Sequence, residues 1–229
     1  EISLGLVGSE MCIRDRGWVA VMIIRETKVG NSVHNSQSAP IISSGADYFL
    51  PLYCLKTNVM TNFREIKPTE ISDNFIRSIG QEWMLITAGD RQRSNAMTAS
   101  WGMVGQMWGK PAALVVVRPQ RYTRELVETH DMLSLAFFDA AYRSALEYCG
   151  SRSGRDEDKV RNAGLTVDYT EAGTPMIREA RLVLECRKLY RDDLRGEAFL
   201  DSGLAGKWYP EKDFHRMYML EIVRVYVKK

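Results

Sequence analysis

Residues 95–110 read NAMTASWGMVGQMWGK, a run typical of a β-strand with an unusual distribution of small side chains. Successive side chains of a strand point to opposite faces, so every second residue shares a face. One face carries Asn95, Met97, Ala99, Trp101 and Met103, and the other carries Ala96, Thr98, Ser100, Gly102 and Val104. A strand that covers a core normally turns branched or aromatic side chains inward. The small second face is therefore expected to lie against something other than an ordinary core.

Composition indicates a soluble globular protein with one sizeable core. The chain has 229 residues, of which 45% are hydrophobic, and its 31 basic and 29 acidic side chains give a net charge of +2. This balance, without runs of like charge, predicts neither nucleic acid nor a membrane as a partner. The four cysteines, at positions 12, 54, 149 and 186, show no CxxC spacing. We therefore expect a reducing, cytoplasmic compartment and no metal site.

The first 59 residues differ in kind from the rest. The opening EISLGLVGSEMCIRDR resembles a translated sequencing adapter, and the stretch that follows it is rich in Ser, Asn and Gly. A signal peptide is the alternative, but the apolar run GWVAVMII is short, Arg25 closes it, and no small-residue cleavage site follows. We interpret residues 1–59 as a non-native or disordered extension, with Met60 as the native start and residues 60–229 as one domain.

The pattern after Met60 predicts strands interrupted by short helices. Thr69 could cap a helix over residues 70–79 that ends at Gly80. Further helices are expected after Thr123, in AYRSALEYCG and after Ser153, and strands at 83–89, 95 onward, 112–117, 134–138, 181–190 and 215–229. Because the elements do not alternate as regular βαβ units, they favour a mainly β fold, a closed antiparallel barrel with short helical insertions.

Two polar segments could bind a phosphate. In RPQRYT, the residues Arg118, Gln120, Arg121, Tyr122 and Thr123 fall between a strand end and the first turn of a helix, where free N–H groups point outward. The alternative is an ordinary Thr N-cap with solvated arginines. In SGRDEDK, Ser153 would begin a helix, Gly154 would allow close backbone approach, and Lys159 would follow one turn on. The alternative there is a capped helix with Asp156 and Lys159 as a surface pair.

Taken together, NAMTASWG, RPQRYT and SGRDEDK resemble, in order and spacing, the flavin reductase-like or flavoredoxin family. The resemblance runs from about Gly80 to the C-terminus and implies an FMN-binding split β-barrel of Greek-key type. It implies that the small face of Ala96, Thr98 and Ser100 lies along the isoalloxazine ring. It also implies that Arg121, Tyr122 and Thr123 hold the phosphate and that Ser153, Gly154 and Lys159 close the site. The residues implied to edge and underlie the flavin are Asn95, Ala96, Met97, Thr98, Ala99, Ser100 and Trp101.

The resemblance also suggests a catalytic residue. His215 corresponds to a family histidine near the reactive face of the flavin, although members often carry GDH where this chain reads EKDFHR. A partly buried structural histidine is the alternative. His130, Cys149 and Cys186 are expected to be structural. Trp108 and Trp208 could belong to the core, a dimer contact or a lid over the flavin.

Two functions are compatible with these residues. One is an FMN-dependent enzyme that takes hydride from NADH or NADPH, which would act as a transient co-substrate. The other is a flavoredoxin-type FMN electron carrier. No GxGxxG motif follows a strand, so a dedicated Rossmann nicotinamide site is not expected. The family resemblance further implies a homodimer, and a redox partner protein is a further expected partner.

Overall fold

The computed structural model describes residues 12–15, 18–21, 54–55 and 62–229, and the chain divides into two compact units, Glu1–Asn58 and Val59–Lys229. In the first unit, β1 (Cys12–Asp15), β2 (Trp18–Val21) and β3 (Cys54–Leu55) form an antiparallel sheet in the order β1-β2-β3. The interpretation of residues 1–59 as a non-native or disordered extension stays a prediction. The proposed native start, Met60, lies outside the described residues.

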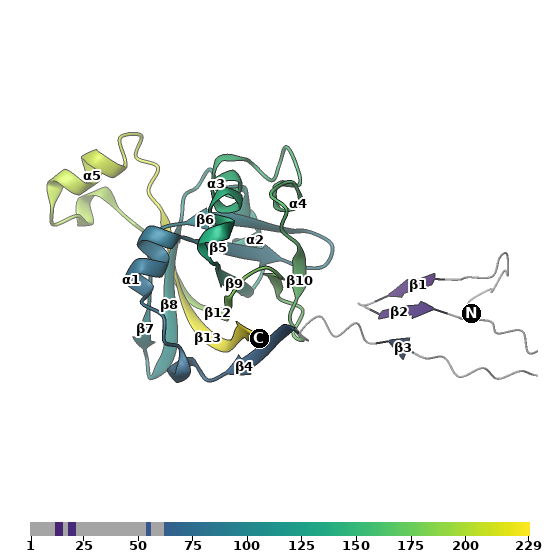
Figure 1. Ribbon diagram of the computed structural model, residues 1–229. Helices are drawn as coiled ribbons and strands as arrows, with labels where there is room; N and C mark the ends of the chain where they lie inside the picture. Colours follow the sequence, from purple (N-terminus) through teal and green to yellow (C-terminus); the bar gives the residue numbers. More distant parts are fainter. Residues whose placement is uncertain (1–11, 16–17, 22–53, 56–61) are drawn as a thin grey trace, which may run out of the picture. The chain divides into compact units, whose positions relative to one another are not determined.

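The second unit is a mainly β barrel, as the sequence predicts (Figure 1). Seven strands pair antiparallel in the order β6-β5-β9-β12-β13-β8-β7, and β4 pairs with β13 off this path. The sheet comprises β4 (Phe63–Ile66), β5 (Met84–Gly89), β6 (Ser94–Ala99), β7 (Gly102–Met107), β8 (Lys110–Val117), β9 (Met132–Phe137), β12 (Leu182–Asp193) and β13 (Arg216–Lys228).

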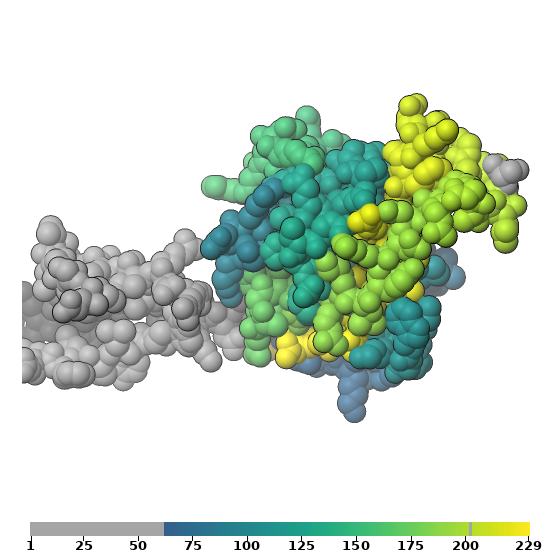
Figure 2. Space-filling model, turned by 180° about the vertical axis from the view of Figure 1, so that it is seen from behind, coloured from purple at the N-terminus to yellow at the C-terminus, as the bar shows by residue number. Residues whose placement is uncertain are grey.

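Short helices and a hairpin interrupt the barrel strands. The helices are α1 (Phe75–Arg77), α2 (Tyr122–Thr129), α3 (Arg143–Ser151), α4 (Lys159–Asn162) and α5 (Ser202–Trp208), and the hairpin pairs β10 (Val167–Tyr169) with β11 (Pro175–Ile177). The segment with α5 connects β12 to β13 and projects from the barrel in two opposite views (Figures 1 and 2).

Two hydrophobic clusters lie on opposite sides of the sheet. Strand β5 contributes Met84, Ile86 and Ala88 to the cluster inside the barrel, together with Leu126 of α2. Leu85 of the same strand points the other way, into a second cluster with residues of α3. Because both faces of β5 are buried, its sequence is apolar at every position except Thr87 and does not alternate.

Helix α3 packs on the small face of β6 at Ala96 and Thr98. Ala96 is 0% exposed and belongs to the cluster with Leu146. Thr98 Oγ1 donates a hydrogen bond of 2.5 Å to the Leu146 carbonyl. A Cβ added to Gly150 of α3 would lie 3.3 Å from Thr98 Cβ. Small residues are therefore needed on both elements because the helix backbone approaches the strand closely.

Local structure departs from three helix predictions. The expected helix over 70–79 is a 3-10 turn at Pro68–Glu70 followed by α1 and a π-helix at Ser78–Glu82, with Asn74 instead of Thr69 accepting the capping hydrogen bond. Helix α2 starts one residue early, with Arg121 at its N-cap position. Ser153 begins only a turn, since α4 begins at Lys159 and is capped by Asp158.

Candidate functional site

Two adjoining cavities of about 190 and 180 Å³ lie where β6, the start of α2 and the end of α3 meet. Met97 and Arg121 line both, so the two form one continuous region. The first is lined by Met97, Thr98, Ala99, Ser100, Trp101, Val116, Arg118, Arg121, Trp208 and His215. The second is lined by Met97, Gln120, Arg121, Tyr122, Thr123, Ser151, Arg152, Ser153, Gly154 and Lys159. Together they reach the size of a small-molecule site, roughly 300–1,000 Å³.

All of the residues that the sequence predicts for the site line these cavities, except Asn95 and Ala96. Asn95 is buried beside the second cavity, where its Nδ2 donates to Thr123 Oγ1 at 2.8 Å. Ala96 packs in the cluster with α3 and lines neither cavity, so its contact with the flavin stays a prediction.

The second cavity holds two cations with no anionic partner. Arg121 Nη1 donates to the Gly150 carbonyl at 2.8 Å, which leaves the other N–H groups of the guanidinium available. Lys159 Nζ donates to the carbonyls of Cys149 and Arg152 at 2.8 and 3.0 Å. Within residues 62–229, neither side chain forms an ion pair with a carboxylate. Two neighbouring cations that lack a counterion favour an anionic ligand between them.

Lys159 is buried, which corrects the alternative of an exposed pair with Asp156. Lys159 is only 4% exposed. Burial lowers the pKa of the Lys159 ammonium, and the nearby charge of Arg121 lowers it further. Since an anion would favour the charged form, the site gains binding energy from a phosphate that an uncharged ligand could not supply.

Gly154 has no side chain, which allows Asn95 and Tyr122 to lie close to its backbone at the wall of the second cavity. A Cβ at this position would lie 2.2 Å from Asn95 Oδ1 and 3.0 Å from Tyr122 Cδ1. The hydroxyl of Tyr122 is occupied by Arg93 Nε at 2.6 Å, so Tyr122 contributes its ring to the wall. Thr123 Oγ1 accepts from Asn95 and keeps its own hydrogen for a ligand.

The first cavity has an aromatic wall. The Trp101 ring lies 5.0 Å from the Trp208 ring, edge to face, and 5.1 Å from the His215 ring. His215 is 8% exposed, and its Nδ1 lies 2.9 Å from the hydroxyl of Tyr209. Burial lowers the pKa of His215 to about 4, and the charge of Arg118 contributes. The ring is therefore neutral near pH 7, so it does not supply positive charge to the cavity.

Arg118 fixes the segment that carries Trp208, a role that the sequence pattern did not identify. Its Nη2 donates to the Trp208 carbonyl at 2.9 Å, and its Nη1 pairs with Asp213. Gln120 Nε2 also donates to Asp213, at 2.8 Å. Arg118 and Gln120 belong to the same RPQRYT segment as Arg121, so one loop supports both cavities.

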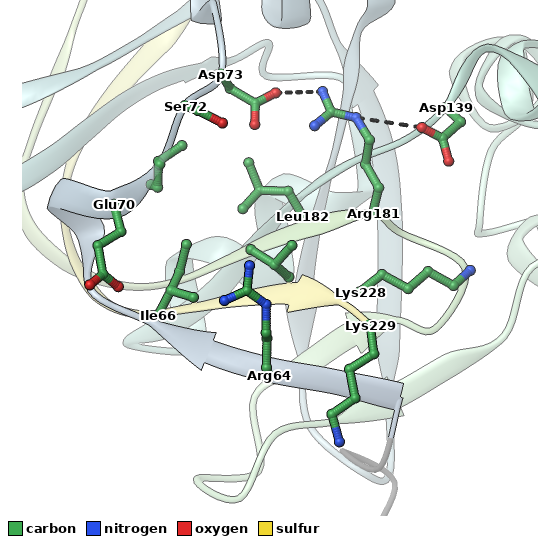
Figure 3. A pocket seen from close by; sticks show the side chains of 12 residues that line it. Arg64, Ile66, Glu70, Ser72, Asp73, Asp139, Arg181, Leu182, Lys228 and Lys229 are labelled. Carbon is green, nitrogen blue, oxygen red and sulfur yellow. Dashed lines mark ion pairs between the residues drawn. The ribbon is translucent and has the colours of Figure 1, made fainter.

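A larger cavity of about 430 Å³ elsewhere shares no lining residue with these two (Figure 3). Its Arg181 is already paired with Asp73 at 2.6 Å and Asp139 at 3.9 Å. Arg64 and Lys228 also line this cavity, but none of its lining residues belongs to the three sequence motifs. Among the residues that the structure describes, no group of His, Cys, Asp and Glu could hold a metal ion, and no helix could cross a membrane.

The antiparallel sheet, its helical insertions and the joined cationic and aromatic cavities define a split-barrel protein with a site for a small ligand. Residues 76–229 match the family model described as flavin reductase like domain, and the chain belongs to this family. The resemblance that the three sequence motifs indicate is thereby confirmed.

Relatives from two organisms are similar to parts of the chain. The protein YddH of Escherichia coli (strain K12) is 36% identical over 46% of this chain and 58% of its own length. A protein of Aeropyrum pernix is 30% identical over 44% of this chain and 39% of its own length. The chain thus spans about half the length of the curated relatives it matches.

Solved structures support the fold. Flavoredoxin from Methanosarcina acetivorans is 26% identical with a TM-score of 0.50, and the match covers 65% of this chain and 69% of that one. An FMN-binding domain of a flavin reductases-like enzyme from Shewanella baltica has a TM-score of 0.54 at 17% identity, covering 73% and 78% of the two chains. The second likeness, at its low identity, concerns the fold alone.

Proposed function

We propose that this chain binds FMN and acts as an oxidoreductase that transfers hydride from NADH or NADPH to the flavin. One observation carries the proposal: Arg121 and Lys159, two cations without a carboxylate partner, converge on a cavity that continues into an aromatic one. A ligand with a phosphate at one end and a planar ring at the other matches this pair of cavities.

The residues of the second cavity would hold the phosphate. Arg121 and Lys159 would supply charge, and Thr123 would donate a hydroxyl hydrogen bond. Ser153 would line the same cavity near Gly154, whose missing side chain leaves space beside Asn95. The carbonyl partners of both cations hold them in place before a ligand arrives, which reduces the ordering cost of binding.

The residues of the first cavity would hold the ring. Met97, Thr98, Ala99, Ser100 and Trp101 would border it along the end of β6, by backbone as well as side chain. FMN, when bound, would supply the redox chemistry, and the protein would supply position and electrostatics. His215, neutral and held by Tyr209, would help to place the second substrate rather than balance charge. Positive potential would come from Arg121 instead.

An electron carrier is the second candidate function. The likeness to flavoredoxin from Methanosarcina acetivorans, at 26% identity, favours it. In a carrier, FMN would stay bound and exchange electrons with a redox partner protein, without a nicotinamide reaction. The charges of this chain are interspersed, with a net of only +2, so no strongly charged docking face favours that reading over the enzyme.

We also propose a homodimer. Several large apolar side chains on β7, β12, β13 and the β7–β8 turn are exposed, and the Trp108 ring lies 6.4 Å from that of Tyr190. A second copy would cover this surface, which comprises Met103, Met107, Trp108, Tyr190 and Val223.

Flavin titrations test the proposed site directly. Quenching of flavin fluorescence should give a low-micromolar or tighter Kd for FMN. Arg121→Ala and Thr123→Ala should weaken FMN by about tenfold each but leave riboflavin, which lacks the phosphate, nearly unchanged. Equal losses for both flavins would place the phosphate elsewhere, and no binding of either would refute the proposal.

Addition of NADH or NADPH to the flavin-loaded protein separates the two functions. Bleaching of the flavin, with turnover when free FMN is in excess, supports the enzyme. A flavin that stays oxidised with both nicotinamides, yet is reduced by dithionite, would establish the carrier instead.

A further inference from the structure

We infer that Trp208 is a specificity-determining residue: with Trp101 it forms the binding surface for a planar, negatively charged second substrate, which for the proposed reductase is the nicotinamide dinucleotide. The inference rests on the proposed function, because the substrate would have to meet the flavin in the first cavity. It concerns a residue of the segment between β12 and β13, outside the motifs of the family resemblance.

Packed aromatic residues and Arg118 hold the backbone at Trp208 in place. Its neighbour Tyr209 is buried, and the Tyr209 ring contacts those of Phe214 at 4.9 Å and Phe199 at 5.9 Å. Arg118 holds the Trp208 carbonyl and also pairs with Asp213, so it fixes both ends of the intervening turn. The backbone of Trp208 is therefore held in place while part of its side chain remains exposed.

The Trp208 side chain is 42% exposed, although it lies edge to face with Trp101 at the rim of the first cavity. A large aromatic surface held half in solvent beside a cavity gains free energy when a flat ligand covers it. Since Trp101 and His215 continue the row of rings into the cavity, a planar ligand on Trp208 would be directed toward the flavin site.

The charged side chains beside Trp208 indicate which class of ligand would bind there. Lys207 Nζ lies 5.1 Å from the Trp208 ring, and within the described part of the chain it forms no ion pair. Arg118 is paired with Asp213, whereas Lys207 has no carboxylate partner among residues 62–229. An aromatic ring next to an available cation fits a planar substrate that carries phosphates.

The test compares Trp208→Ala with Leu204→Ala, a matched control. Leu204 belongs to the same helix and is 41% exposed, but it lines neither cavity. For each FMN-loaded protein we would measure the Kd of FMN by flavin fluorescence, the Kd of unreactive NAD⁺ by calorimetry, and KM and kcat with NADH and NADPH.

Trp208→Ala should raise the Kd for NAD⁺ and the KM about tenfold, a clearly larger change than the one in the Kd for FMN. Trp208→Phe should recover most of the affinity, and Leu204→Ala should match the wild type. Equal dinucleotide affinity in Trp208→Ala and the control would overturn the inference, as would a wild-type holoprotein that binds FMN but no dinucleotide. Loss of FMN binding by the wild type would instead refute the proposed function itself.

Discussion

Replacing Gly154 by alanine should damage the second cavity and the fold together. The new Cβ would lie 2.2 Å from Asn95 Oδ1 and 2.7 Å from its Cγ. Carbon atoms in contact stay about 3.5–4.0 Å apart, so the amide of Asn95 must move by more than about 1 Å. That movement breaks its buried 2.8 Å hydrogen bond to Thr123.

The cost follows from the groups that lose their partners. Losing a hydrogen bond costs about 1 kcal/mol, and leaving a buried polar group unsatisfied costs about 1–3 kcal/mol. We therefore expect Gly154→Ala to lower the free energy of unfolding by about 2–3 kcal/mol. For a domain of this size that corresponds to a Tm lower by roughly 5–10 °C. FMN affinity should fall at least about tenfold, because the displaced amide enters the phosphate cavity.

Thermal unfolding and FMN titration measure both effects. Gly105→Ala is the control, because an added Cβ there meets nothing within 4 Å. Removing the clashing amide should relieve the strain, so Gly154→Ala combined with Asn95→Ala should lose less stability than the sum of the two single changes. A Gly154→Ala protein with wild-type Tm and wild-type FMN affinity would refute this account of the cavity.

Three further measurements test other parts of the structure. His215 has a folded pKa of about 4, below its usual 6.5, so the unfolded chain takes up a proton first as the pH falls. The free energy of unfolding should then decrease between about pH 6.5 and 4 by up to about 3 kcal/mol, and urea unfolding should show that His215→Gln loses this dependence. Deleting residues 1–59 should leave Tm and FMN affinity unchanged; a lower value of either would show that the extension supports the barrel. Sedimentation equilibrium should give a dimer that Trp108→Glu converts to monomer, whereas a monomeric wild type would contradict the proposed interface.

Elements that consist mainly of apolar residues were predictable from the sequence, because their own composition indicates burial. Strands β5 and β8 are apolar runs, and both appear close to their expected bounds. The actual structure of residues 70–79 was not predictable, because contacts distant in sequence determine the backbone conformation there. Asp73 pairs with Arg181, more than one hundred residues away. Local apolar spacing carries no information about such an ion pair.

The sequence indicated which residues line the candidate site better than it indicated how those residues are held in place. The motifs named Arg121 and Lys159, but the carbonyl groups that hold them come from the end of α3. Trp208 remained open between core, dimer contact and lid because its position depends on Arg118, 90 residues earlier. A residue's type and spacing can indicate that it binds something, whereas its orientation depends on partners that only the fold brings near.

The small face of β6 acts on the site indirectly. Ala96 and Thr98 let helix α3 approach the strand, and the end of α3 presents the Gly150 carbonyl to Arg121. Close packing transmits small changes in side-chain volume, so a larger residue at position 96, which lines neither cavity, would displace that carbonyl from a distance. The run that opens with NAMTAS therefore contributes twice: its small side chains position the helix that holds the cations, and its end borders the aromatic cavity.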